Sequence, residues 1–167
     1  MNKNKKPAPR AALGEGPIRV LLAEDEESFV DALVIGLTNE GFRVVVARDG
    51  VEALRLYEET DPDILLLDLM LPKMSGIDVC RAIRTRSRVP IIMVTAQTDR
   101  NALLDALEAG AEEFLTKPVN RAELWLRVRN LMRLKEMRDL LDAHNTSLER
   151  EVSARTAELQ QFRTAMD

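Results

Sequence analysis

Five polar residues stand where short apolar runs end, and their types suit one kind of chemistry. Glu24 and Asp25 follow the first run, and Asp68, Thr95 and Lys117 follow later ones. Three carboxylates in one crevice repel each other unless a cation neutralises them. Oxygen ligands favour a hard ion such as Mg²⁺ or Mn²⁺. A metal beside a hydroxyl and an ammonium group suits a phosphoryl group, with Asp68 as the nucleophile that forms an acyl phosphate.

The elements that must position these residues are visible in the hydrophobic pattern. Apolar runs predict strands at residues 18–23, 42–47, 63–68, 90–95 and 112–115. Helices are predicted at 27–39, where Phe29, Val30 and Leu33 share a face, and at 50–59, 76–85 and 99–109. Such alternation is typical of a parallel sheet with helices on both faces, which binds ligands beyond the carboxyl ends of its strands.

Each of these residues also has a structural interpretation that needs no ligand. Asp25 and Thr95 are suited to capping the helices that follow them, and Lys117 before Pro118 fits an exposed loop. We favour a shared site because all five residues stand at predicted strand ends, which the fold brings to one edge.

Four segments in order resemble the motifs of the bacterial two-component response-regulator receiver domain (the CheY-like family). They read LLAEDE, LLLDLMLPKMSG, PIIMVTA and GAEEFLTKP, within residues 18–130. The resemblance implies an α/β, flavodoxin-like, doubly wound sheet of five parallel strands in the order 2-1-3-4-5. It also implies a phosphoprotein of a phosphorelay. Separately, because no apolar run suits a membrane span or a signal peptide, we expect a cytoplasmic location.

The motifs assign an acceptor and its metal ligands. By resemblance, Asp68 is the phospho-acceptor, and Glu24, Asp25 and Asp68 bind the metal together with the backbone carbonyl of Met70. Receivers more often carry Asp-Asp than the Glu24–Asp25 pair. Because Glu24 is longer by one methylene, we expect it to act mainly through a metal-bound water.

The remaining motif residues are those that respond to phosphorylation. By resemblance, Thr95 is the switch hydroxyl, Phe114 the switch aromatic and Lys117 the lysine that pairs with the phosphoryl group. Phe114 replaces a frequent Tyr, so it has no hydroxyl to bond when it turns inward. The donor implied is a histidine kinase or a phosphotransfer protein.

Two other classes of protein remain as alternatives. A haloacid-dehalogenase-like or other flavodoxin-like phosphatase would also use Asp68 as nucleophile, but needs a second acid two residues later. Met70 stands there and cannot move protons, so we expect acceptance and self-dephosphorylation only, and no enzyme. A nucleotide-binding module would need a Gly-rich loop after the first strand, and the sequence has none there.

The last helix is expected to continue as a coiled coil, because no Gly or Pro follows Arg121 and a 3-4 apolar spacing persists. The a positions are Leu124, Leu131, Arg138, Asn145, Val152, Leu159 and Met166, and the d positions are Arg127, Leu134, Leu141, Leu148, Arg155 and Phe162. Leu at d and Asn145 at a favour a parallel homodimer through residues 124–166. The arginines weaken this seam, and the alternative is a lone amphipathic helix folded onto the receiver.

The predicted organisation is a disordered leader (1–17), a receiver (18–130) and a coiled-coil linker helix (131–167). The stretch SLEREVSARTAELQQFRTAMD resembles linkers that precede PAS, cyclic-di-GMP or kinase output domains. Two earlier segments, LLDLMLPKMSG and RSRVPIIMVTA, more closely resemble receivers of DNA-binding regulators. Truncation and a composite origin therefore both stay open.

Composition limits the remaining functions. The 167 residues include 24 Lys and Arg against 28 Asp and Glu, and no segment joins a basic face to aromatics, which argues against direct nucleic-acid binding. No apolar run is long enough to span a membrane. The single cysteine, Cys80, excludes an internal disulfide and is expected to be a buried hydrophobe, and the single histidine, His144, makes a transition-metal site unexpected.

Overall fold

The computed structural model describes residues 16–96 and 100–166 and contains a five-stranded parallel sheet. The elements are β1 (Arg19–Ala23), α1 (Glu27–Asn39), β2 (Arg43–Ala47), α2 (Gly50–Thr60), β3 (Ile64–Leu67), α3 (Gly76–Arg84), β4 (Ile91–Thr95), α4 (Arg100–Glu108), β5 (Glu113–Thr116) and α5 (Arg121–Met166). The strand order is β2-β1-β3-β4-β5. This confirms the flavodoxin-like fold. Asp99, where a helix was predicted to begin, lies outside the described residues.

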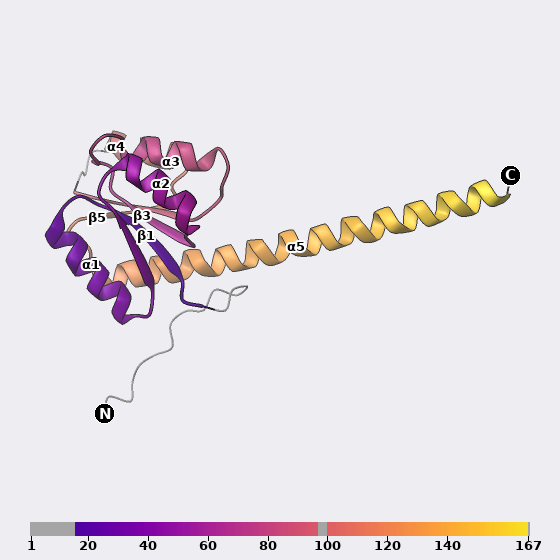
Figure 1. Ribbon diagram of the computed structural model, residues 1–167, viewed down its shortest axis with the longest axis horizontal. Helices are drawn as coiled ribbons and strands as arrows, with labels where there is room; N and C mark the ends of the chain where they lie inside the picture. Colours follow the sequence, from indigo (N-terminus) through magenta and orange to yellow (C-terminus); the bar gives the residue numbers. More distant parts are fainter. Residues whose placement is uncertain (1–15, 97–99, 167) are drawn as a thin grey trace, which may run out of the picture. The chain divides into compact units, whose positions relative to one another are not determined.

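Alternate residues of the central strands face opposite layers of helices. In β3, Ile64 and Leu66 pack with α1 and the first turns of α5, whereas Leu65 and Leu67 pack with α2 and α3. Figure 1 shows these two layers, with α1 and the start of α5 on one side of the sheet and α2, α3 and α4 on the other. Because both faces are covered, β3 is apolar throughout.

The register brings the carboxyl ends of the strands together. Ala23, the last residue of β1, pairs with Leu67 at the end of β3, and Thr95 at the end of β4 pairs with Thr116. We call this boundary of the sheet the carboxyl edge. The residues singled out for chemistry lie at this edge: Glu24, Asp68 and Lys117 directly follow β1, β3 and β5, Asp25 follows Glu24, and Thr95 is the last residue of β4.

Cys80 and Arg84 of α3 hold the turn between α4 and β5. The Cys80 thiol is buried and donates to the carbonyl of Ala109 at 3.4 Å, and burial raises its pKa. The Arg84 guanidinium donates to the Gly110 carbonyl at 2.8 Å and forms an ion pair with Glu112 at 2.8 Å. The prediction that Cys80 is a buried hydrophobe is confirmed.

The first turns of α5 belong to the domain core. Leu124 and Leu131 are 1% and 6% exposed and pack with Val128 and Met132 against the sheet. Their assignment to a dimer seam through residues 124–166 is therefore wrong at its beginning. A helix that covers a sheet and one that covers another helix repeat their apolar residues at similar spacings, so periodicity alone did not distinguish the two.

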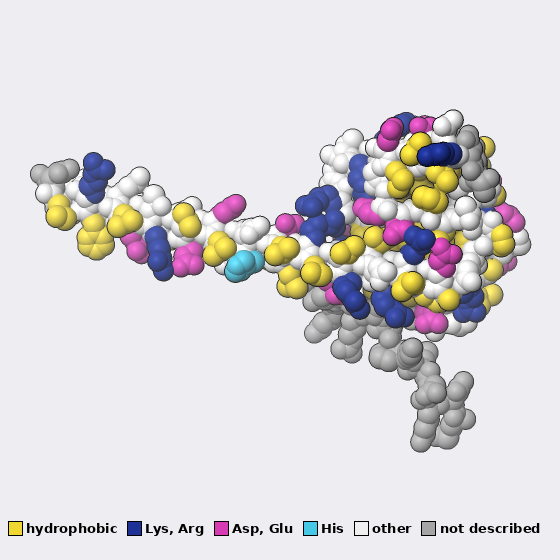
Figure 2. Space-filling model, turned by 180° about the vertical axis from the view of Figure 1, so that it is seen from behind, with side chains coloured by type: hydrophobic (Ala, Val, Ile, Leu, Met, Phe, Trp, Pro, Cys, Tyr) yellow, Lys and Arg dark blue, Asp and Glu magenta, His cyan; other side chains and the backbone are white. Residues whose placement is uncertain are grey.

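The chain divides into two compact units between Met132 and Arg133, and α5 contributes to both. In the second unit the apolar side chains are exposed, and Figure 2 shows several of them in yellow. They are Leu134, Met137, Leu140, Leu141, Leu148, Val152, Leu159, Phe162 and Met166. Across the described ranges, none of the helices combines the length and apolar character that a membrane crossing requires.

Candidate functional site

Glu24 leaves β1 and turns its carboxylate back toward the backbone. It is 1% exposed, and its Oε1 accepts hydrogen bonds from the N–H groups of Asp25 and Glu26 at 3.1 and 3.0 Å. Desolvation raises the pKa of Glu24, and the hydrogen bond from Lys117 opposes part of this rise. Such a buried carboxylate requires a nearby cation to remain charged.

Asp25 is exposed, and the N-cap position of α1 belongs to Glu26. The interpretation of Asp25 as a helix cap is therefore not supported. Its carboxylate lies instead with those of Glu24 and Asp68, and one oxygen from each of the three falls within 4.8 Å of the others. The structure thus brings together the three predicted acids.

Asp68 follows β3 directly and is held from several sides. Its N–H donates to the carbonyl of Ala23 at 3.0 Å, its Oδ1 accepts from the N–H of Met70 at 3.1 Å, and its side chain is largely buried. The α3 helix begins so close that a Cβ on Gly76 would lie 2.0 Å from the Asp68 carbonyl oxygen. Only glycine fits at that position without displacing backbone.

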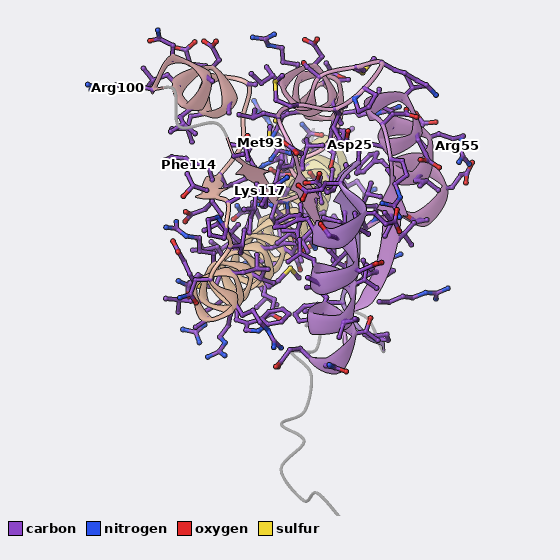
Figure 3. All side chains as sticks on the ribbon, turned by 90° about the vertical axis from the view of Figure 1, so that its left-hand side faces the viewer. Asp25, Arg55, Met93, Arg100, Phe114 and Lys117 are labelled. Carbon is purple, nitrogen blue, oxygen red and sulfur yellow. The ribbon has the colours of Figure 1, made fainter. Side chains whose placement is uncertain are left out.

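Lys117 connects the acids that come from β1 and β3. Its Nζ lies 2.5 Å from Glu24 Oε2 and 3.0 Å from Asp68 Oδ2. Although desolvation lowers the pKa of Lys117, hydrogen bonds and charge from both carboxylates outweigh this effect, so the pKa is raised. Figure 3 labels Asp25 and Lys117, which both lie at the carboxyl edge.

The two switch candidates are Thr95, on the neighbouring strand β4, and Phe114, three residues before Lys117 in β5. Thr95 is buried at the end of β4, and its carbonyl accepts a hydrogen bond from the N–H of Lys117 at 2.9 Å. Phe114 pairs with Met93 in the sheet and is half-buried against the α2–α3–α4 side of the core. The side chain of Met70 is exposed, which leaves its backbone as the part directed to the site by the hydrogen bond with Asp68.

Sequence reasoning missed two neighbours of Lys117. The Phe29 ring lies under the ammonium group, with its centroid 4.4 Å from Nζ, and Glu26 Oε2 lies 3.9 Å from the same atom. The helical spacing places Phe29 on the apolar face of its helix and predicts no contact with Lys117. The acidic run from Glu24 to Glu27 was the available signal for Glu26.

The donor set fits a hard divalent cation. It consists of carboxylate oxygens from Glu24, Asp25 and Asp68, which Mg²⁺ prefers over nitrogen or sulfur ligands. Two of the three residues are buried, so their charges are poorly screened by water. The structure therefore supports an acidic metal site at the carboxyl edge.

Comparisons with known proteins agree with this geometry. The sequence model of the "Response regulator receiver domain" family matches residues 20–129. The sensory transduction protein RegX3 of Mycolicibacterium smegmatis is 49% identical over 114 residues, which cover 68% of this chain and 50% of the relative. The DNA-binding response regulator MtrA of Mycolicibacterium paratuberculosis is 47% identical over 115 residues, 69% of this chain and 51% of the relative. The chain spans about half the length of these relatives.

Solved receiver structures share the fold. The receiver domain of the Pseudomonas aeruginosa sensor histidine kinase PA1611, described with a magnesium ion in its active-site cleft, is 32% identical with a TM-score of 0.66. The match covers 70% of this chain and 98% of that one. A receiver domain from Vibrio parahaemolyticus is 30% identical with a TM-score of 0.70, covering 75% and 97%. The family model matches most of the chain, and the strand order is that of the solved receivers' fold. We conclude that this chain belongs to the response regulator receiver domain family of two-component systems, here followed by a long C-terminal helix.

Proposed function

We propose that this chain accepts a phosphoryl group on Asp68 from a histidine kinase or phosphotransfer protein. The observation that carries the proposal is the position of the Lys117 ammonium, 2.5 Å from Glu24 and 3.0 Å from Asp68. The Lys117 ammonium thus forms ion pairs with both Glu24 and the proposed acceptor, Asp68. Both oxygens of Asp68 are held, one by the N–H of Met70 and one by Lys117.

In the proposed reaction, a carboxylate oxygen of Asp68 attacks the phosphorus of a phosphohistidine. An O–P bond forms, the N–P bond breaks, and the imidazole leaves with the electron pair and takes a proton from water. A bound Mg²⁺ or Mn²⁺ would supply positive charge for the phosphoryl oxygens, held by Glu24, Asp25, Asp68 and the carbonyl of Met70. Lys117 pairs with a phosphoryl oxygen and Thr95 donates a hydrogen bond to another.

The switch would then pass from the phosphoryl group to the surface of β5. Movement of Thr95 toward the phosphoryl group frees the space into which Phe114 turns. The hydrogen bond between the Thr95 carbonyl and the Lys117 N–H supports this coupling, because it joins the two responding segments directly. Phe114 is half-buried, so its rotation changes both the core and the exposed face.

Turnover as a phosphatase is not supported by the neighbourhood of Asp68. The residue two positions later, Met70, has no titratable group, and its side chain is exposed. Without a general acid at this position, protonation of an alcohol leaving group lacks a donor there. The proposed chemistry is therefore one phosphoryl transfer per signalling event, followed by hydrolysis of the acyl phosphate.

The proposed route out of the domain is a parallel homodimer of the second unit. Its core positions are Leu134, Arg138, Leu141, Asn145, Leu148, Val152, Arg155, Leu159, Phe162 and Met166. Leu159 and Phe162 are each 70% exposed, so this apolar stripe is available to a second copy. The g-to-e′ pairs His144–Glu149 and Glu158–Arg163 fit a parallel arrangement. The seam begins at Leu134, since Leu124 and Leu131 are occupied in the core.

Labelling by a small phosphodonor tests the acceptor. With acetyl phosphate and Mg²⁺, we expect the wild-type chain to gain one phosphoryl group by intact-mass spectrometry and Asp68→Asn to gain none. Asp31→Asn, a change of an exposed acid on α1, should label as wild type. Undiminished labelling of Asp68→Asn would remove Asp68 as the acceptor.

Solution mass tests the dimer separately. We expect analytical ultracentrifugation to find a dimer that Leu148→Lys converts to a monomer, because the ammonium enters an apolar d layer. Ala143→Lys adds the same charge at an f position, on the opposite side of the helix, and should remain dimeric. If the wild type is monomeric both with and without beryllofluoride and Mg²⁺, the dimer proposal fails and the labelling result stands alone.

A further inference from the structure

The Lys117 ammonium has an aromatic neighbour in addition to its carboxylates. Its Nζ lies 4.4 Å from the centroid of the Phe29 ring, within the range in which a cation is attracted to the face of an aromatic ring. The site carboxylates at 2.5 and 3.0 Å lie on other elements, at the ends of β1 and β3. The ring therefore provides a neutral contact to a group that otherwise has charged partners.

The domain core holds the Phe29 ring in place. Phe29 is in the first turn of α1, is half-buried, and packs against the core on the α1–α5 side of the sheet. Glu26, the other nearby residue of this segment, is 3.9 Å from Nζ and mostly exposed, so water screens its charge. Phe29 is thus the better fixed of the two contacts that sequence reasoning missed.

We propose that Phe29 is a positioning residue that keeps the Lys117 ammonium beside Asp68 during phosphoryl transfer. The inference rests on the proposed function of Asp68 as acceptor. In that reaction both carboxylate partners of Lys117 change. Asp68 becomes an acyl phosphate, and a bound metal would compete with Lys117 for the oxygens of Glu24 and Asp68. The attraction of the ring for the ammonium does not depend on either change, so it persists through the reaction.

A direct structural readout is the proton chemical shift of the Lys117 side chain. Protons held over a ring face are shifted upfield. We expect the Lys117 ε-methylene protons of the wild type to be upfield of those of exposed lysines, and Phe29→Leu to remove this shift. Phe29→Tyr retains the aromatic face and should restore it.

The functional readout is the rate of labelling by acetyl phosphate in the presence of Mg²⁺. We expect Phe29→Leu to lower the second-order rate constant about three- to tenfold, the size of effect that a partly desolvated cation–π contact supports. Phe29→Tyr should stay within about twofold of wild type on the same basis. Phe42→Leu is the matched control, because it removes an aromatic ring from the same core cluster, where Phe42 stacks on Trp125. It should label at the wild-type rate.

These measurements separate three cases: a positioning role for Phe29, a loosened core, and an incorrect proposed function. If Phe29→Leu loses the chemical shift but labels at the wild-type rate, the positioning role is overturned. If Phe29→Leu and Phe42→Leu slow labelling equally, the effect is core loosening and the role is again overturned. If the wild-type chain accepts no phosphoryl group, the proposed function fails, and with it the positioning role in that reaction, whatever the chemical shift shows.

Discussion

Lys117→Met removes the cation that compensates two largely buried carboxylates while keeping a side chain of similar length. At an effective dielectric constant of about 20, the 3.0 Å separation between Lys117 and Asp68 corresponds to about 5.5 kcal/mol before desolvation is subtracted. Removing one partner of a buried ion pair costs about 3–5 kcal/mol. Because the Lys117 side chain is 13% exposed, we expect the lower end, about 3 kcal/mol of unfolding free energy, without Mg²⁺.

The same variant should depend on pH in a defined direction. The pKa of Glu24 is already raised from its usual 4.5, first by desolvation, and Lys117 opposes this rise. Without Lys117 the pKa rises further, so above pH 4.5 the folded state binds more protons than the unfolded state. Stability then falls as pH rises through the folded-state pKa. The loss should be larger at pH 8 than at pH 5.

Urea unfolding in EDTA measures both effects. Lys73→Met is the control, since Lys73 also lies 3.0 Å from an aspartate, Asp49, but its side chain is 66% exposed. A pair in which the lysine is this exposed contributes about 0–1 kcal/mol, because water screens its charge. If Lys117→Met costs no more than Lys73→Met, or if its stability increases with pH, the account of a charge-compensated buried cluster is wrong. Added Mg²⁺ should restore part of the lost stability.

Two further predictions concern how the site is supported. Gly76→Ala places a Cβ 2.0 Å from the Asp68 carbonyl and should lower the unfolding free energy by more than about 2 kcal/mol, whereas Gly16→Ala, with open space around it, should change it little. Arg84→Ala releases the α4–β5 turn and should cost about 2 kcal/mol, because charged hydrogen bonds are lost. Arg81→Ala breaks only an exposed pair within α3 and should cost less than about 0.5 kcal/mol in the same urea titration.

The fold and the meeting of the acids could be predicted because they follow from periodicity and topology. Four aliphatics in a row at 64–67 require a strand covered on both faces, and parallel strands bring their carboxyl ends together. Glu24, Asp25 and Asp68 were therefore expected to lie close together, whatever the conformation of the loops that follow them. The boundaries of the strands differed from the expected ones by a residue, as for β3, which excludes Asp63 and Asp68.

Partnerships that depend on side-chain direction could not be predicted. The helical spacing of Phe29 is satisfied by the core, and nothing in the spacing shows that its ring also meets an ammonium group from a segment 88 positions later. Likewise, Leu124 and Leu131 satisfy a heptad pattern while packing on their own sheet. A periodic pattern predicts that one face of a helix is buried, but it does not identify the element that buries it.

Because α5 is one continuous helix, the length of the linker determines how the domain is oriented relative to any protein fused after it. The helix carries its core-packed residues up to Met132 and its exposed apolar stripe from Leu134 onward. Each residue added or deleted between them turns the stripe by about 100° about the helix axis, whereas seven residues turn it by only about 20°. Under the proposed dimer relay, chimeras should therefore tolerate changes of linker length in steps of seven and should lose their response at the intermediate lengths.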